Sequence, residues 1–382
     1  MDEQLKILDA SFNATDSVIL FGAGRNCETF INNLKKDVSV AAFIDNDRNK
    51  QGTEILGIKV YPLDEAKKLS KNYKIIINSE TYYHEMAAQL LELGLVENVD
   101  FTSILKFQAV WYWNNKRKII LFQTTSYITS KCTLNCLYCE SLIPYHPLKD
   151  NVDFNSLKND YDLYFSIIDK VRVFHLFGGE PFLHEQLLSI LTYIMDKYSH
   201  KIDRLRITTN GMIVPCREIL KYLSEKRIYV VVSDYNFDLG YRETQQKVVS
   251  LLISNNIPFD IDSGVIRKDF LIPRKKRKKT GRVNTIEYMR SCSSQFKCIG
   301  DGGFYYCGTA YNAEKIGYFR HPQKEYIDMN KIKRNLDKKR FLEFYLGEFG
   351  NYDSLSLCND CAGYSRHNTR IVNPVIQISY NK

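Results

Sequence analysis

The stretch CTLNCLYC at residues 132–139 places three cysteines within eight residues. Cys132, Cys136 and Cys139 have the spacing C-x3-C-x2-C, and the residues before them predict a β-strand near 121–128 that runs into this loop. A structural zinc site needs four closed ligands, whereas three thiolates with no histidine or fourth cysteine nearby suit an iron-sulfur cluster with one open iron. The loop therefore predicts a cluster whose open iron carries the chemistry.

A pattern of alternating strands and helices continues beyond this loop. The predicted strands lie near residues 121–128, 171–177, 204–209, 228–233 and 258–262, and the predicted helices near 155–170, 183–197, 215–225 and 240–254. Repeated β/α units of this kind close into a full or partial barrel, whose active site lies on the loops after the strands. The three-cysteine loop has such a position.

Glycine-rich or polar segments end the next three predicted strands. Gly178-Gly179-Glu180-Pro181 ends the second strand, Thr208-Thr209-Asn210-Gly211 the third, and Ser233-Asp234 the fourth. Glycine lets the backbone approach a ligand closely. Taken alone, Gly178-Gly179 is better explained by an ordinary strand-to-helix turn.

These motifs, in this order, resemble those of the radical S-adenosylmethionine (radical SAM) superfamily, which also has an aromatic residue just before the last cysteine, here Tyr138. The resemblance implies that Cys132, Cys136 and Cys139 hold three irons of a 4Fe-4S cluster while the fourth iron binds S-adenosylmethionine. A flavodoxin or ferredoxin-type donor would supply the electron that cleaves this cofactor. The resulting 5'-deoxyadenosyl radical would then remove hydrogen from a substrate in van der Waals contact.

The resemblance also implies which residues bind the cofactor. The backbone near Gly178 would hold its amino group, the ends of the third and fourth strands would contact its ribose, its carboxylate or the substrate, and Tyr138 would pack near the adenine unless it is a core tyrosine. The implied cofactor-binding residues are Tyr138, Gly178, Gly179, Glu180, Pro181, Thr209, Asn210, Ser233 and Asp234.

A second group of cysteines lies in the last quarter of the chain. Cys292 and Cys307 flank Gly302 in a C-x9-G-x4-C pattern, and Cys358 and Cys361 follow. Four such thiolates are typical of zinc or iron-sulfur sites. The pattern resembles the SPASM and twitch extensions of radical SAM enzymes, and the small number of cysteines favours the twitch form with one auxiliary 4Fe-4S cluster. Cys298 is an alternative to Cys292, and a structural zinc ribbon is an alternative to the cluster.

The N-terminal region predicts a small parallel sheet, with strands at 18–21, 38–44 and 74–78. Gly22-Ala23-Gly24 precedes a helical pattern that starts at Cys27, and Asp45 ends the next strand, which meets most of the dinucleotide-binding fingerprint. We expect Gly22 and Gly24 to receive a phosphate and Asp45 a ribose. Cys27 replaces the third glycine, which disfavours a complete NAD site. The whole stretch, including residues 43–47 and 52–60, resembles the Rossmann-like domain of enzymes that act on nucleotide-linked sugars and surface polysaccharides. A domain that serves only packing or dimerisation is the alternative.

The predicted fold class is therefore α/β with three domains. We expect a Rossmann-like domain over residues 1–105, a linker over 106–120, a partial (β/α)6 TIM-type radical SAM barrel over 121–288, a small Cys-rich C-terminal twitch domain over 289–365 and a tail over 366–382.

Composition excludes several classes of protein. The chain has 382 residues, 44% hydrophobic and 25% charged, which excludes a disordered or collagen-like chain. The net charge of +9 falls to +3 without the basic run 274–279, which we interpret as a solvated loop or as a phosphate clamp. An acidic start and the lack of an apolar run of about 18 residues predict a cytoplasmic protein with no membrane span. Cysteines in that compartment bind metals or catalyse.

The predicted function is a radical SAM oxidoreductase that abstracts hydrogen from a carbohydrate, nucleotide-linked, and oxidises an alcohol to a ketone in surface-glycan or small-molecule biosynthesis. Three alternatives are a sugar epimerase, an enzyme that modifies a ribosomally made peptide, and a non-catalytic iron-sulfur sensor that binds nucleic acid through residues 274–279. The cofactor-binding motifs disfavour the sensor and a nucleic-acid partner. The glycine motif at residues 22–24 disfavours the peptide enzyme.

Overall fold

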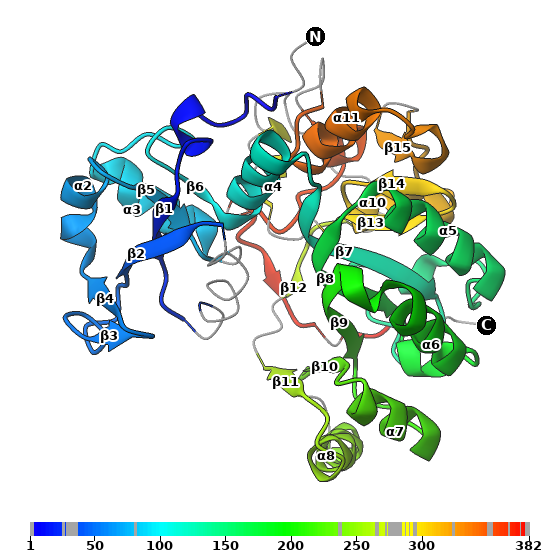
Figure 1. Cartoon of the computed structure of the whole chain (residues 1–382). Helices are drawn as coiled ribbons and strands as arrows, with labels where there is room; N and C mark the ends of the chain where they lie inside the picture. Colours follow the sequence, from blue (N-terminus) through cyan, green and yellow to red (C-terminus); the bar gives the residue numbers. More distant parts are fainter. Residues whose placement is uncertain are drawn as a thin grey trace. The chain divides into compact units, whose positions relative to one another are not determined.

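The structure of the chain, a computed structural model (Figure 1), forms two compact units, Met1–Ile120 and Leu121–Lys382. The basic run 274–279 and most of the helix predicted from Cys27 lie outside the described residues. The described residues are 4–24, 27, 37–79, 82–235, 239–263, 267–271, 273, 285–286, 288–289, 291–292, 296–322, 325–349, 354–365, 367–374 and 376–378.

The first unit is built on a six-stranded sheet with the order β3-β4-β2-β1-β5-β6. All neighbours pair in parallel except β3 and β4. The apolar runs of β1 and β5 are completely buried along most of their length because the sheet packs on both faces. The strands are β1 (Ser17–Phe21), β2 (Ser39–Ile44), β3 (Glu54–Ile55), β4 (Ile58–Tyr61), β5 (Lys74–Ile77) and β6 (Phe101–Ser103).

The residues predicted as a linker, 106–120, are instead mostly helical and belong to the first unit. Helix α4 (Ile104–Lys116) begins where the Ser103 hydroxyl accepts a hydrogen bond from the Lys106 amide. It buries Phe107, Val110 and Trp113 among other side chains, so ordering these residues removes apolar surface from water. The other helices of this unit are the short α2 (Ala66–Leu69) and α3 (Tyr83–Glu92).

The second unit contains an eight-stranded sheet with the order β11-β10-β9-β8-β7-β13-β14-β15. All five strands predicted for the barrel are present. They are β7 (Ile120–Thr129), β8 (Lys170–Gly178), β9 (Ile202–Thr209), β10 (Tyr229–Ser233) and β11 (Phe259–Asp262).

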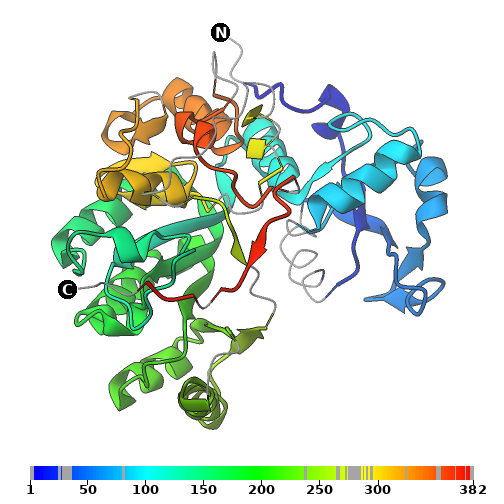
Figure 2. The same cartoon turned by 180° about the vertical axis from the view of Figure 1, so that it is seen from behind.

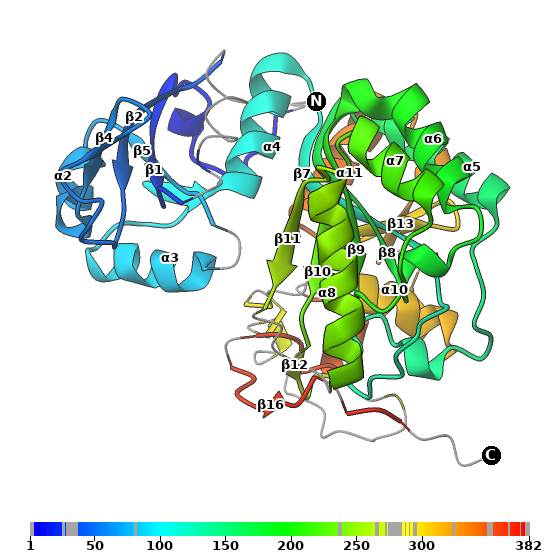
Figure 3. The same ribbon diagram turned by 90° about the horizontal axis from the view of Figure 1, so that it is seen from below.

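Helices cover one face of this sheet (Figure 3). On β7, Thr124 and Ser126 bond the hydroxyls of Tyr164 and Tyr161 from α5, so the alternate residues of β7 face the opposite side. The helices are α5 (Phe154–Ile167), α6 (Leu187–Tyr198), α7 (Arg217–Glu225) and α8 (Leu239–Ser254). Among the described residues, no helix has the length and apolar character needed to cross a membrane.

The segment predicted as a separate twitch domain, 289–365, continues the same sheet. β13 (Cys298–Gly300) pairs in parallel with β7, and the Thr125 amide donates to the Lys297 carbonyl at 2.8 Å. β14 (Gly303–Tyr305) and β15 (Tyr326–Asp328) follow as antiparallel strands. The predicted boundary at residue 288 therefore does not divide the molecule into separate compact units. Helices α10 (Gly308–Lys315) and α11 (Asn335–Tyr345) belong to this part.

The predicted tail also has ordered contacts. β12 (Arg267–Lys268) pairs with β16 (Ile371–Val372), and Figure 2 shows the red C-terminal segment continuing past this ladder toward the segment after β7. Residues 376–378 reach the three-cysteine loop, as described below.

Candidate functional site

The three-cysteine loop follows β7, as predicted. The Cys139 amide donates to the Cys136 carbonyl at 3.1 Å, which closes a turn between these two thiols. The Leu134 amide lies 3.4 Å from Cys132 Sγ and donates to it. Such donors favour the thiolate, which is the form that binds iron.

The electrostatics of the loop fit a positively charged group between the thiols. Burial, together with the neighbouring thiols, raises the pKa of Cys132 to about 12 and that of Cys136 to about 11. Burial also raises the pKa of Cys139. A bound metal centre would reverse this penalty, because a coordinated thiol is deprotonated. The three residues therefore fit the ligand set of a cluster.

Two glycines hold the end of β8 against the start of this loop. Gly178 has a φ of +149°, and a Cβ at this residue would lie 2.3 Å from the Thr129 carbonyl oxygen. A Cβ at Gly179 would lie 2.0 Å from the Lys131 carbonyl oxygen. The amides of Gly179 and Glu180 donate to these same two carbonyls. Only glycine permits this close approach, so packing against the loop backbone already requires both glycines, and their contact with a cofactor stays a prediction.

Glu180 is completely buried beside the loop. Its carboxylate accepts hydrogen bonds from the Thr209 hydroxyl at 2.9 Å and from the amides of Asn210 and Phe182 at 2.8 and 3.1 Å. Burial raises its pKa to about 7, although the three donors oppose this rise. Pro181 begins the short helical turn that follows. Glu180 thus ties the ends of β8 and β9 together, at the position where the sequence predicted cofactor binding.

Asn210 connects β9 directly to the cysteine loop. Its side-chain amide donates to Cys132 Sγ at 3.6 Å and to the Thr133 hydroxyl at 3.0 Å. The Tyr241 hydroxyl lies 2.7 Å from the carbonyl oxygens of both Asn210 and Ser233, so the ends of β9 and β10 share one partner. The predicted residues on β8, β9 and β10 therefore meet at one edge of the sheet.

Tyr138 and Asp234 make other contacts. Tyr138 packs against an apolar cluster that also contacts Cys307, Cys361 and Tyr364, which is the role of a core tyrosine. The Asp234 amide donates to the Asp262 carbonyl at 2.9 Å and so continues the β10-β11 ladder.

Glu180→Gln is expected to remove a pH dependence of stability. The pKa of the Glu180 carboxyl is about 7 in the folded protein, whereas its ordinary value is 4.5. The protonated carboxyl therefore contributes its full stabilisation of the folded state below the pKa of the unfolded chain. This stabilisation is lost as the pH rises through 7. Between about pH 6 and pH 8 the loss is about 1 kcal/mol. Denaturation of the protein without S-adenosylmethionine should show that the free energy of unfolding of Glu180→Gln increases relative to that of the wild type over this pH range. Glu225→Gln, at an exposed residue, should have the same pH dependence as the wild type. Equal pH slopes for all three proteins would show that Glu180 does not titrate here.

The four C-terminal cysteines meet around one small apolar cavity. Cys292, Cys307, Cys358 and Cys361 all line it, together with Tyr306 and aliphatic side chains. Burial raises the pKa of Cys358 well above its ordinary value, and the other three thiols raise it further. The structure therefore brings together the four residues predicted to hold the auxiliary cluster.

Backbone amides also point at these sulfurs. The Tyr364 amide donates to Cys292 Sγ and the Gly363 amide to Cys361 Sγ, each at 3.3 Å. Cys298 does not line this cavity. It is completely buried on β13 in a cluster with Tyr127, Tyr305 and Tyr311. The geometry thus places Cys292, and not Cys298, in the group of four.

The described donor side chains can also be compared with the geometry that a single metal ion needs. Within the described ranges, no three His, Cys, Asp or Glu side chains converge closely enough to hold one metal ion. A 4Fe-4S cluster does not require such convergence, because each thiolate binds its own iron.

A buried ion pair lies between the two cysteine groups. Arg267 Nη1 is 2.8 Å from Glu140 Oε1, and both side chains are largely buried. Glu140 follows Cys139 in the chain, and its carbonyl accepts a hydrogen bond from the Thr309 hydroxyl, two residues after Cys307. No local pattern could indicate this ion pair, because its partners are 127 residues apart in the chain.

The predicted nucleotide residues of the first unit also lie together. Gly22 has a φ of +106°, and Asp45 Oδ2 accepts a hydrogen bond from the Ala23 amide at 2.8 Å within the turn from Gly22 to Gly24. The same oxygen lies 3.2 Å from Lys50 Nζ. Asp45 thus binds its own glycine turn in this structure, and a ribose would have to share or replace these contacts.

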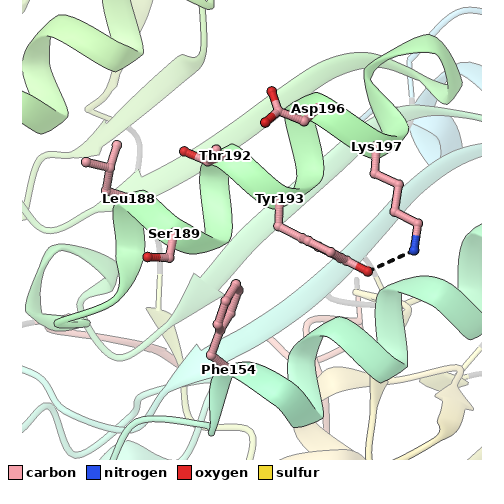
Figure 4. Close-up of a pocket in the computed structure, with 7 residues that line it drawn as sticks. All are labelled: Phe154, Leu188, Ser189, Thr192, Tyr193, Asp196 and Lys197. Carbon is pink, nitrogen blue, oxygen red and sulfur yellow. Dashed lines mark hydrogen bonds between the residues drawn. The ribbon is translucent and has the colours of Figure 1, made fainter.

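A surface pocket of about 700 Å³ is formed by α5 and α6 (Figure 4). It is lined by Phe154 from α5 and by residues of α6 that include Tyr193 and Lys197, which are joined by a hydrogen bond of 2.9 Å. None of its lining residues belongs to either cysteine group, so we assign it no part in the chemistry.

Two regions of the chain match known families. Residues 14–99 match the family described as C2185-like, N-terminal. Residues 126–247 match the radical SAM superfamily, and this range contains the three-cysteine loop and the ends of β8, β9 and β10. Radical SAM chemistry, with its 4Fe-4S cluster and S-adenosylmethionine, is therefore supported for this chain. The match ends before the four C-terminal cysteines, so an auxiliary cluster and a twitch domain stay predictions, as does the Rossmann-like name for the first unit.

Curated relatives match part of the chain. The probable GTP 3',8-cyclase of Methanococcus aeolicus is 24% identical over 220 residues, which cover 56% of this chain and 65% of that protein. The GTP 3',8-cyclase of Campylobacter jejuni subsp. doylei is 31% identical over 134 residues, which cover 33% of this chain and 39% of that protein. The chain thus spans less than two thirds of the length of these relatives.

Solved structures show a more distant likeness. AnSMEcpe with bound AdoMet and the Cp18Cys peptide has a TM-score of 0.41 and 15% identity, and the match covers 68% of this chain and 93% of that one. BtrN in complex with AdoMet and 2-DOIA has a TM-score of 0.38 and 16% identity, with coverage of 66% and 99%. These values are too low to carry an argument about substrate.

Proposed function

Because residues 126–247 match the radical SAM superfamily, we propose that this protein oxidises an alcohol to a ketone on a nucleotide-linked carbohydrate, in surface-glycan or small-molecule biosynthesis. The observation that carries this proposal is the cavity lined by Cys292, Cys307, Cys358 and Cys361 in the same compact unit as the three-cysteine loop. Four thiolates would complete the coordination of an auxiliary cluster, which can then exchange electrons without binding substrate.

Cys132, Cys136 and Cys139 would hold the cluster that, together with S-adenosylmethionine, supplies the 5'-deoxyadenosyl radical. The chain's own residues position this site. Glu180 fixes the ends of β8 and β9, and Asn210 donates to a sulfur ligand and to Thr133. The buried edge formed by these residues excludes water from the reaction.

Oxidation of an alcohol also requires a proton acceptor. Glu140 is the described carboxylate that lies between the two cysteine groups, and Arg267 holds its Oε1 atom in place at 2.8 Å. We assign Glu140 to accept the hydroxyl proton while the substrate electron leaves toward the four-cysteine site.

The position of Cys298 supports oxidation over epimerisation. An epimerase needs a hydrogen donor, usually a thiol, on the opposite face of the substrate. Cys298 is completely buried among Tyr127, Tyr305 and Tyr311, so its thiol faces a tyrosine cluster. Cys216 is exposed at the start of α7, where water has free access.

An arginine pair on β9 supports an anionic substrate. Leu205 and Ile207 are buried, whereas Arg204, Arg206 and Thr208 face the other side of the sheet and are partly accessible. None of the ion pairs among the described residues involves either arginine. A phosphate or carboxylate would pair with these positive charges, as expected for a nucleotide-linked sugar.

Arg206 is held by neutral partners. Its Nη2 atom lies 3.1 Å from Gln123 Oε1 and 3.1 Å from His175 Nδ1. His175 must accept this bond, so its Nε2 donates to the Thr208 hydroxyl at 2.8 Å. Burial, together with the positive charge of Arg204, lowers the pKa of Arg206 to about 10. Arg206 Nε is buried without a partner among the described residues, which leaves a donor for a ligand.

Arg206→Met is expected to weaken binding of UDP and of UDP-glucose by about ten- to a hundredfold, because hydrogen bonds to charged groups contribute about 1.5–3 kcal/mol. Anaerobic calorimetry on the full chain measures this change. Arg206→Lys should recover part of the affinity, and Arg217→Met, at an exposed residue of α7, should bind as the wild type does. If Arg206→Met binds these nucleotides with unchanged affinity and Asp45→Ala loses affinity, the nucleotide binds to the first unit instead.

The proposed function itself is tested by anaerobic incubation of the reconstituted protein with S-adenosylmethionine and a panel of nucleotide sugars. GTP and a short cysteine-containing peptide belong in the panel, because they represent the curated relatives and the peptide-modifying alternative. The expected result is 5'-deoxyadenosine and a product lighter by two hydrogens with a nucleotide sugar only. Turnover with GTP or the peptide alone would refute the proposal.

A further inference from the structure

The end of the chain forms a short antiparallel pairing with the three-cysteine loop. The Leu137 amide donates to the Ile376 carbonyl at 2.7 Å, and the Ile378 amide donates to the Asn135 carbonyl at 2.9 Å. The Asn135 side chain adds a bond of 2.7 Å to the Ile378 carbonyl. Cys136 is thereby paired with Gln377.

Gln377 contacts a cluster ligand directly. Its Nε2 atom lies 3.2 Å from Cys136 Sγ, and its Oε1 atom accepts a hydrogen bond from the Asn135 amide. The Asn135 amide can only donate, so it fixes the orientation of the Gln377 side chain. The NH2 group must therefore be the part that faces the sulfur, and it donates to Cys136.

The residues before Gln377 anchor this contact to the body of the second unit. Ile371 and Val372 pair with Lys268 and Arg267, and the Asp269 amide donates to the Arg370 carbonyl at 2.9 Å. Arg267 also bonds Glu140, next to Cys139. Residues 367–374 and 376–378, which we name the C-terminal clasp, thus have one attachment upstream of Gln377 and another at the cysteine loop.

We propose that the C-terminal clasp completes the binding site of the radical-forming cluster, and that Gln377 is a positioning residue that raises the reduction potential of this cluster. The inference rests on the proposed function only for the presence of the cluster. Reduction adds negative charge to the cluster and its sulfur ligands, so a hydrogen-bond donor at Cys136 Sγ stabilises the reduced state more than the oxidised state. The pairing with residues 135–137 also covers part of the half-buried Cys136, so its loss would open this thiol further to water and oxygen, although Gln377 itself is exposed.

The test is a redox titration followed by electron paramagnetic resonance on the reconstituted full chain, without substrate. Gln377→Leu removes the donor, and we expect the reduction equilibrium of the three-cysteine cluster to fall about tenfold, or about 59 mV for one electron. The second cluster serves as an internal reference. Ile376→Val is the matched control, because Ile376 contributes only its backbone to the pairing, and its titration should match the wild type.

A second variant ends the chain at Val372 and removes the whole pairing. We expect the same shift in potential and a several-fold faster loss of iron-sulfur absorbance in air. Iron content and thermal unfolding of each variant show whether it has folded. A normal cluster with an unchanged potential in Gln377→Leu would overturn the role of the clasp and leave the proposed function intact. If the wild type lacks the open-iron cluster signal, the proposed function fails and the clasp fails with it.

Discussion

Replacement of Cys132, Cys136 and Cys139 by alanine is expected to lower the iron content of the anaerobically reconstituted protein from about eight to about four irons per chain and to abolish cleavage of S-adenosylmethionine. These three thiols lie in one loop, and within the described residues no other cysteine lies in that loop to replace them. The four C-terminal cysteines line a separate cavity, so their cluster should remain. Iron analysis and chromatography of 5'-deoxyadenosine measure the two effects.

Cys216→Ala is the matched control for this variant, because Cys216 is exposed and is in neither cysteine group. It should keep about eight irons and full cleavage. Cleavage of S-adenosylmethionine by the triple variant would show that the open iron lies elsewhere. Loss of all iron would show that the two sites depend on each other for folding.

The part of this site that could be predicted from the sequence depends on short spacings and on the ends of parallel strands. The spacing of Cys132, Cys136 and Cys139 is local, and Gly178 and Glu180 follow a recognisable apolar strand. Parallel strands bring their carboxyl ends to one edge of a sheet, so their meeting with Asn210 could be expected. What the spacing could not show is that a Cβ at Gly179 would collide with the Lys131 backbone.

The features that could not be predicted from the sequence depend mostly on contacts between residues far apart in the chain. β13 inserts beside β7 although about 170 residues separate Cys298 from Thr125. For this reason the barrel and the predicted twitch domain share one sheet and one compact unit, and the boundary between them stays a prediction. Gln377 reaches Cys136 across 241 residues, and a short polar segment near a chain end has no periodicity that would reveal such a contact. Helix α4 was not predicted because its buried residues, many of them aromatic, lie all around the helix and leave no amphipathic pattern.

Cys358→Ala is expected to separate the two halves of the proposed reaction. Cys358 lies in the cavity with Cys292, Cys307 and Cys361, so its loss opens the four-thiolate site. Iron should fall from about eight to about four per chain. Cleavage of S-adenosylmethionine with a chemical reductant should continue, because the three-cysteine loop is intact, but the ketone should no longer form. Parallel measurement of 5'-deoxyadenosine and of product mass checks both statements.

Cys298→Ala is the matched control, since Cys298 is a buried cysteine nearby that lies outside this cavity. It should retain about eight irons and one ketone for each S-adenosylmethionine consumed. Zinc in place of half the iron in the wild type would refute the auxiliary cluster in favour of a zinc ribbon.

The same pair of variants also decides between oxidation and epimerisation. A substrate radical that has lost hydrogen must either give up an electron, for which the site around Cys358 is needed, or regain a hydrogen atom from a thiol. Cys298 is buried among three tyrosines, so this structure supports loss of an electron by the substrate radical. Solvent deuterium at a stereocentre with no loss of mass, unaffected in Cys358→Ala and abolished in Cys298→Ala, would reverse that assignment and identify an epimerase.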